Sequence, residues 1–138
     1  MAQYPPVANQ ILKAPGFVVS GAGTDTNIDF ANSSFRGITI TYKASATSGG
    51  GSQTLAAKLQ GRDANGNYYD IPGAAFVSNA ADTSVSYVLS VYPGVTTATV
   101  AKAKVQDGVI PANLRLVLTP ASGTNPTYTL GIAYTFLP

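Results

Sequence analysis

Residues 53–76 alternate between more polar and apolar side chains around a turn signal, which restricts this stretch to β structure. The polar set is Thr54, Ala56, Lys58 and Gln60, and the apolar set is Leu55, Ala57, Leu59 and Gly61. The run ends in the sequence Asp-Ala-Asn-Gly-Asn, after which Tyr68 and Tyr69 begin a second run of β-forming residues. The pattern predicts a β-hairpin, with Asn65 and Gly66 both at positive φ in a tight primed turn.

Several other segments share this two-residue period. The predicted strands are 17–20, 27–30, 36–43, 84–92, 113–119 and 127–136, with a weaker edge strand within 96–110. No window shows the apolar spacing of an amphipathic helix together with capping residues. The fold class predicted is all-β: an antiparallel, jelly-roll-like β-sandwich of about eight strands with an extended N-terminal arm.

The first 16 residues differ from the rest, because Pro5, Pro6 and Pro15 oppose regular strand pairing. The predicted division is an arm over 1–16 and a β-sandwich domain over 17–138. We expect the arm to dock on a partner rather than to build the fold. Its apolar anchors, and the candidate partner-binding residues, are Tyr4, Val7, Ile11 and Leu12.

The amino-acid composition excludes most of the common catalytic mechanisms. The 138 residues contain no His, Cys, Trp or Glu, so neither a Ser-His-Asp triad nor a thiolate site can form. The acidic residues are six aspartates, and Asp63 and Asp70 are the pair that a hairpin could bring together. A turn aspartate usually bonds to its own backbone, however. We therefore expect a protein that is not an enzyme, with no catalytic residue and no cofactor.

Two sets of oxygen ligands are incomplete as calcium sites. The set at Asp25, Asn27 and Asp29 has the spacing of a calcium loop but lacks its glycine and its final carboxylate. The set at 63, 65, 67 and 70 offers only two carboxylates. No metal site is expected.

Charge and hydropathy bear on the partners. The eight basic residues are scattered and the net charge is +2, which does not predict nucleic-acid binding. No run of apolar residues is long enough to span a membrane, and the chain does not open with the residue order of a signal peptide, so we expect synthesis and use without export by that route and no membrane partner. Charged residues form 10% of the chain, against roughly 25% in ordinary soluble domains. Such a surface suggests cover by a partner or by further copies of the chain.

Tyrosines near turns leave a carbohydrate-binding alternative open. Tyr68, Tyr69 and Tyr92 could stack on sugars, and the stretch 63–70 combines aromatic and acidic residues. Tyrosine is equally common at protein interfaces and on half-buried sheets.

Five short motifs between about residues 35 and 135 resemble a group of small structural proteins of tailed bacteriophages. They are Gln60-Gly61-Arg62-Asp63, Asn67-Tyr68-Tyr69-Asp70-Ile71, Val91-Tyr92-Pro93-Gly94-Val95, Ile110-Pro111 with Leu114-Arg115-Leu116-Val117, and Thr127-Tyr128-Thr129-Leu130-Gly131-Ile132. The resemblance implies a virion component on the capsid surface. The resemblance further implies a homotrimeric decoration (cement) protein that binds the major capsid protein. The alternative is a head or tail fibre module that binds a host-surface glycan.

Overall fold

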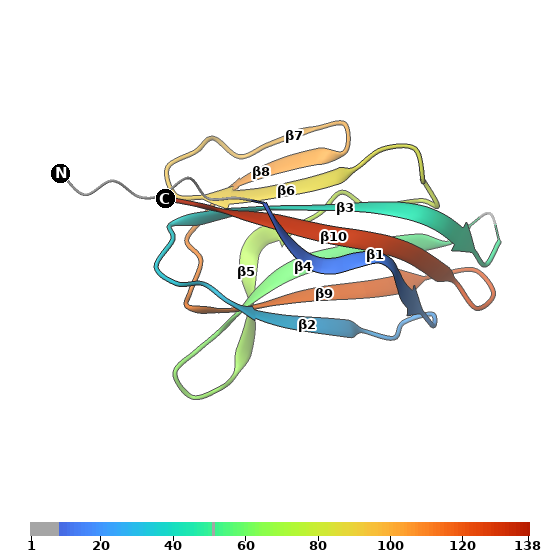
Figure 1. Ribbon diagram of the computed structural model, residues 1–138, viewed down its shortest axis with the longest axis horizontal. Helices are drawn as coiled ribbons and strands as arrows, with labels where there is room; N and C mark the ends of the chain where they lie inside the picture. Colours follow the sequence, from blue (N-terminus) through green and yellow to red (C-terminus); the bar gives the residue numbers. More distant parts are fainter. Residues whose placement is uncertain (1–8, 51) are drawn as a thin grey trace.

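Two β-sheets pack face to face in the computed structural model, which describes residues 9–50 and 52–138 (Figure 1). The larger sheet contains, in spatial order, β1 (Gln10–Ser20), β10 (Thr127–Leu137), β3 (Gly37–Ser48), β6 (Tyr87–Tyr92), β8 (Ala103–Asp107) and β7 (Ala98–Val100). The smaller contains β2 (Thr26–Ala31), β9 (Asn113–Ala121), β4 (Thr54–Arg62) and β5 (Tyr68–Ala75). The described residues form no helix, so the predicted β-sandwich is confirmed.

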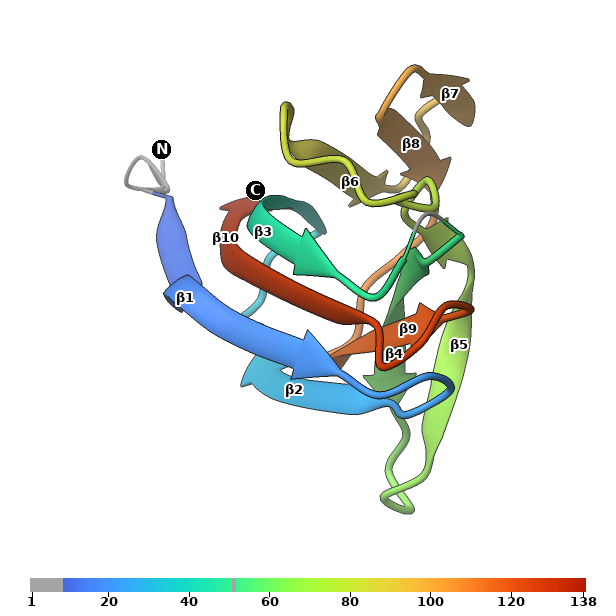
Figure 2. The same ribbon diagram turned by 90° about the vertical axis from the view of Figure 1, so that its right-hand side faces the viewer.

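The strands follow the order of a jelly roll. The first strand, β1, lies beside the last, β10, and β3 lies beside β6; in the other sheet β2 lies beside β9 and β4 beside β5. The chain therefore passes repeatedly from one layer to the other, as Figure 2 shows from the end of the sandwich. Strands β7 and β8 extend this arrangement at the edge next to β6.

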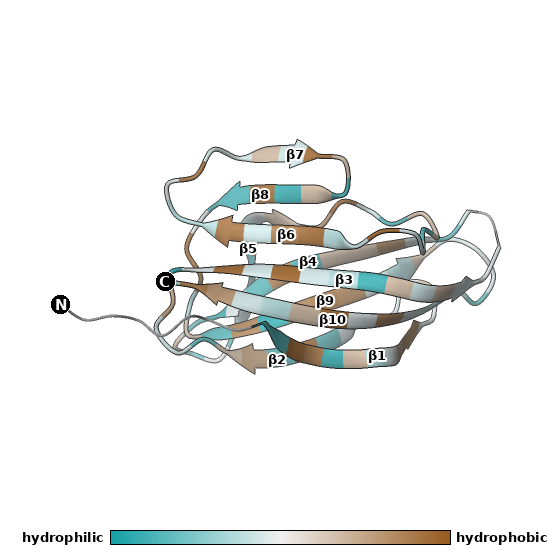
Figure 3. Cartoon of the chain, turned by 45° about the horizontal axis from the view of Figure 1, so that its top comes forward, coloured by the Kyte–Doolittle hydropathy of each residue, from teal (hydrophilic) through white to brown (hydrophobic). Residues whose placement is uncertain are grey.

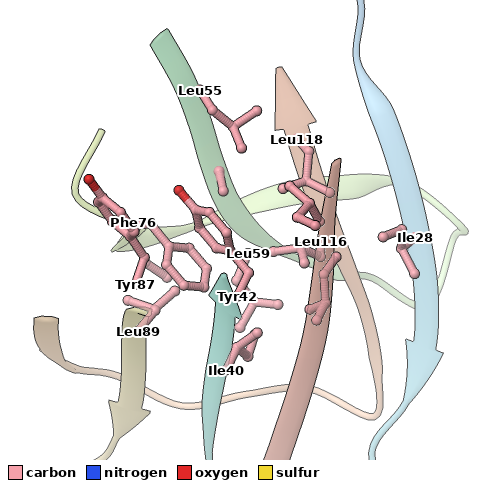
Figure 4. Packing of buried hydrophobic residues seen from close by; sticks show 14 of the residues in the cluster. Ile28, Ile40, Tyr42, Leu55, Leu59, Phe76, Tyr87, Leu89, Leu116 and Leu118 are labelled. Atoms are coloured by element: carbon pink, nitrogen blue, oxygen red, sulfur yellow. The ribbon is translucent and has the colours of Figure 1, made fainter. Parts of the chain in front are cut away.

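Alternation places the predicted apolar faces in the core. The residues buried by β3, β4, β9 and β10 include Ile38, Ile40, Tyr42, Leu55, Leu59, Leu114, Leu116, Leu118, Tyr128, Leu130 and Ile132. Side chains from both sheets meet in this layer (Figure 4), and the alternation that sends them inward is visible along β3 and β6 in Figure 3. Burying one such large side chain contributes roughly 1.5–3 kcal/mol.

The β4–β5 hairpin is confirmed, but its predicted turn type is wrong. Gly66 has φ +87°, whereas Asn65 is not at positive φ. The Gly66 amide donates to the Asp63 carbonyl at 3.1 Å, and the Asp63 amide donates to the Asn67 carbonyl at 2.8 Å. This is a type I turn followed by one left-handed glycine, the usual three-residue loop. One positive φ is enough because the loop contains an extra residue.

The segment 96–110 holds two strands instead of the single edge strand predicted. Ala101, at φ +51°, separates β7 from β8. Strand β8 then pairs in parallel with β6, from Val88↔Ala103 to Tyr92↔Asp107, so the sandwich is not wholly antiparallel. The parallel pairing follows because β7 returns the chain to the start of β6 before β8 begins.

The N-terminal stretch enters the sheet before residue 17. Strand β1 pairs with β10 at Gln10↔Tyr134, Ile11↔Ala133 and Lys13↔Ile132, and its register shifts before Phe17. Pro15 lies within that irregular part, where a residue without an amide hydrogen is tolerated. The boundary predicted between 16 and 17 thus falls inside β1, while residues 1–8 lie outside the described residues.

None of the described residues belongs to a helix that is long and apolar enough to cross a membrane.

Candidate partner-binding surface

A groove of about 570 Å³ runs over the outer face of the larger sheet. Its floor is β10, at Gly131 and Ala133, and its walls come from β1 and β3. Thr83 and Ser86, in the segment before β6, also line it. Because Tyr128, Leu130 and Ile132 point into the core, the intervening residues of β10 face outward, and at this point they are small.

Gly131 lies beneath the close approach of β1. A Cβ placed on this glycine would lie 3.2 Å from the Cα of Pro15, closer than side-chain carbons normally come. The absence of a side chain lets β1 bend over β10 and form one wall of the groove. Pro15, which opposes regular strand pairing, and Gly131, which lies beneath it, therefore shape this surface together.

Lys13 and Lys43 stand on the two walls. Lys43 on β3 is paired with Gly131, and Lys13 on β1 is paired with the next residue, Ile132, so the lysines flank the same part of β10. Lys13 is half-buried with its ammonium 5.1 Å from the centroid of the Phe17 ring, and Lys43 is exposed. No carboxylate lines the groove within the described part of the chain.

Every aspartate already has a partner inside the molecule. Asp29 bonds Arg115, Asp70 bonds Lys58 and Gln60, Asp25 bonds Thr119, Asp63 bonds the amides of residues 65 and 67, Asp82 bonds Ser84, and Asp107 bonds the amide of Gly94. Of the eight cationic side chains, Lys58 and Arg115 form ion pairs with the described carboxylates, leaving six without one. The surface therefore carries cations that the molecule itself does not neutralise.

The smaller sheet has a different outer face, crossed by polar side chains that bond to one another. Asp29, Arg115, Gln60 and Asp70 occupy consecutive strands at paired positions. The Arg115 guanidinium donates to both Asp29 oxygens, at 2.6 and 3.1 Å, and Gln60 donates to Asp70 at 2.9 Å. The hydrogen bond from Arg115 lowers the pKa of Asp29, and those from Gln60 and Lys58 lower the pKa of Asp70.

The carboxylates predicted as possible pairs or ligands are used separately. Asp63 accepts the amides of Asn65 and Asn67, both at 2.9 Å, so the turn interpretation of this residue is confirmed. Asp70 lies with Lys58, and Asp29 with Arg115. Across residues 9–50 and 52–138, no three His, Cys, Asp or Glu side chains gather in a way that would hold a metal ion.

The structure separates the predicted arm residues. Ile11 lines the groove and is 72% exposed, whereas Leu12 is half-buried and packs against the core. Tyr4 and Val7 lie outside the described residues. The sequence did not indicate Lys13, Lys43 or Gly131, because they come from three strands far apart in the chain and carry no local motif.

No known family profile matches the chain, and no curated protein matches it. Two solved structures of infectious bursal disease virus are similar in shape. For the Gt strain the TM-score is 0.47 at 8% identity, covering 95% of this chain and 33% of the other. For the Gx strain the TM-score is 0.44 at 9% identity, covering 94% and 32%. The chain spans about a third of the length of each of these chains.

Proposed function

We propose that the protein is a non-enzymatic virion component that binds the outer surface of a capsid lattice as a decoration (cement) protein. The jelly roll supports this proposal, because it recurs in viral capsid domains, although the same fold also serves lectins. The resemblance of the motifs between residues 35 and 135 to phage structural proteins supports it independently.

One observation carries the proposal: the groove on the larger sheet combines an exposed apolar side chain, Ile11, with two cations that no described carboxylate pairs. Such a surface gains apolar burial and charge pairing only when another molecule covers it. The proposed partner is the major capsid protein. Because a molecule that binds only the assembled lattice favours that state by its binding free energy, the protein would stabilise the capsid by mass action.

Self-association belongs to the proposal as well. A homotrimer would present three such grooves at once, and simultaneous engagement raises the apparent affinity without new contacts. The proposed location is the capsid surface, after synthesis in the host cytoplasm.

The test is rebinding to capsids that lack the protein. We expect purified protein to co-sediment with these capsids and to raise the temperature at which they disassemble. Reversing the charge at the groove with Lys43→Glu should weaken both effects. Lys104→Glu makes the same charge change on β8, outside the lining of the groove, and serves as the control. If wild type and Lys43→Glu bound capsids equally and raised the disassembly temperature equally, the groove would not be part of the proposed contact. A wild type that fails to bind would contradict the decoration role.

The glycan-binding alternative has one observation in its favour. Tyr68 lies on the outer face of the smaller sheet near Gln60 and Asp70, whose amide and carboxylate are suited to sugar hydroxyls. Against it, the Arg115 guanidinium already lies 3.5 Å from the Tyr68 ring centroid, where a sugar would stack. Binding on a glycan array that is lost in Tyr68→Ala would favour this alternative.

A further inference from the structure

We propose that the groove over β10 binds an extended, acidic segment of a partner protein, with one carboxylate held between Lys13 and Lys43. This inference names the kind of contact made in the proposed function and rests on that function for the partner. Its basis in shape and charge can be tested separately.

The shape of the groove fits a single extended chain. Neighbouring strands lie about 4.8 Å apart, so the walls on β1 and β3 are roughly 10 Å from each other across β10. Between them the groove is lined by Gly131 and Ala133, and Pro15 lies over Gly131. A larger side chain at Ala133 would fill the space that Pro15 leaves open, so the depth depends on this small residue.

The charges in the groove select an acidic occupant. Lys13 and Lys43 flank adjacent residues of β10 from opposite sides, and neither is paired with a described carboxylate. Each of these ammonium groups would gain a charge pairing if a carboxylate entered the groove. Each ammonium offers three donors without a fixed plane, which suits a carboxylate that approaches from above the sheet.

The other surfaces of this chain offer only aspartates that already accept hydrogen bonds within the molecule. All six aspartates are engaged within their own molecule, including Asp82, which lies beside the Thr83 end of the groove and accepts bonds from Ser84. A two-fold contact of groove with groove would bring lysines against lysines. A different protein with free Asp or Glu side chains is therefore the occupant that the charges favour.

A nucleic acid is the competing anion, and the surface fits it less well. Binding along a phosphate backbone requires several cations spaced along a track. The groove presents two, at a single level of β10. Its exposed apolar wall at Ile11 also matches a side chain of a peptide better than a phosphate.

The experiment is an NMR titration of the ¹⁵N-labelled full chain with two synthetic heptapeptides. One has the sequence Ac-Thr-Ala-Asp-Ala-Asp-Ala-Thr-NH₂, and the other has Asn in place of both Asp residues. We expect saturable shifts of the amides of Lys43, Gly131 and Ala133 with a Kd on the order of 1 mM. The Asn peptide should bind about tenfold more weakly, and added salt should weaken only the Asp peptide.

Two variants test charge and shape separately. Lys43→Gln should reduce affinity for the Asp peptide by about tenfold, while Lys104→Gln, which makes the same change outside the groove, should leave it unaltered. Ala133→Leu should block both peptides by filling the floor. Retention of the wild-type amide spectrum away from the substitution shows that each variant is folded.

Three results would overturn the inference: no saturable shifts up to about 5 mM peptide, equal binding of the Asn peptide, or tighter binding of an oligothymidylate at the same residues. Failure here leaves the capsid role intact if the protein still binds capsids. If the peptide titration is positive but the protein does not bind capsids, the proposed function is rejected, and the inference that the groove binds acidic segments stands.

Discussion

The guanidinium carbon of Arg115 lies 3.5 Å from the centroid of the Tyr68 ring, so that a residue of β9 covers an aromatic residue of β5. The same guanidinium reaches Asp29 on β2, and the Tyr68 hydroxyl donates to that carboxylate at 3.3 Å. Three strands of the smaller sheet are thus joined on its outer face. This surface satisfies its own polar groups, in contrast to the groove on the opposite side of the sandwich.

The first prediction concerns acid stability. Because the native pKa values of Asp29 and Asp70 are lowered, the unfolded chain binds more protons than the folded chain in the acid range. Their contribution to stability is present above the ordinary aspartate pKa, near 4, and is lost as the pH falls through the lowered native values. Thermal unfolding between about pH 6 and pH 2 should therefore show a falling Tm.

The control for this prediction is Asp29→Asn. The variant should lose only a few degrees of Tm at neutral pH, since the Asp29 side chain is exposed. Its Tm should also change less between the ends of the pH range than that of the parent. Identical slopes for variant and parent would show that Asp29 does not contribute to the pH dependence.

The second prediction separates the two turn residues. Gly66→Val places a β-branched residue at φ +87°, which costs about 1–3 kcal/mol of unfolding free energy. Asn65→Ala should change it by less than about 0.5 kcal/mol, because Asn65 is not at positive φ and contributes its backbone amide to Asp63. Urea unfolding of both variants measures the difference. A large loss of unfolding free energy in Asn65→Ala would instead support the primed turn predicted from the sequence.

The third prediction compares two buried tyrosine hydroxyls. Tyr128 donates to the Asn79 carbonyl at 3.0 Å and accepts the Ala81 amide at 3.3 Å, whereas the Tyr42 hydroxyl has no hydrogen-bond partner among the described residues. Burial raises the pKa of both phenols. Tyr128→Phe should destabilise the protein by about 1–3 kcal/mol, and Tyr42→Phe should be neutral or stabilising. Similar losses in both variants would mean that Tyr42 is hydrogen-bonded in solution.

The fourth prediction concerns the start of the chain. Deleting residues 2–14 removes the pairs of Gln10, Ile11 and Lys13 with β10 but keeps the regular pairing of 17–20 with 127–130. The truncated protein should therefore keep its β-sheet circular dichroism, with a lower Tm because half-buried Leu12 is lost. It should bind capsids more weakly, since Ile11 and Lys13 are gone. Loss of the fold would instead show that the sandwich requires residues 2–14.

The sequence predicts the inward faces well, because alternation is a local signal. Ile38, Leu59, Leu116 and Leu130 each stand in an alternating run, and each is buried. Strand β7 buries neither face: its three residues are all exposed, and an alanine at positive φ follows it. The parallel neighbour of β6 is likewise set by how the chain returns and not by the residues of β8.

The candidate groove could not be predicted from local pattern. Its lysines are thirty residues apart in sequence and meet only because β10, from the end of the chain, lies between β1 and β3. Pro15 signalled an irregular segment, which is correct, but its contact with Gly131 depends on the pairing of the first strand with the last. The Asp29–Arg115 pair, separated by 86 positions, could not be predicted from local sequence for the same reason.

The central claim is that the protein is a repeated structural part of a virus particle, and quantitative mass spectrometry of purified particles tests it most directly. The abundance of peptides from this chain would be compared with that of the major capsid protein. A decoration protein that follows the lattice should be present on the order of hundreds of copies per particle, in a simple ratio to the capsid subunit. About a dozen copies would indicate a tail or fibre position, and absence from the particle would contradict the account.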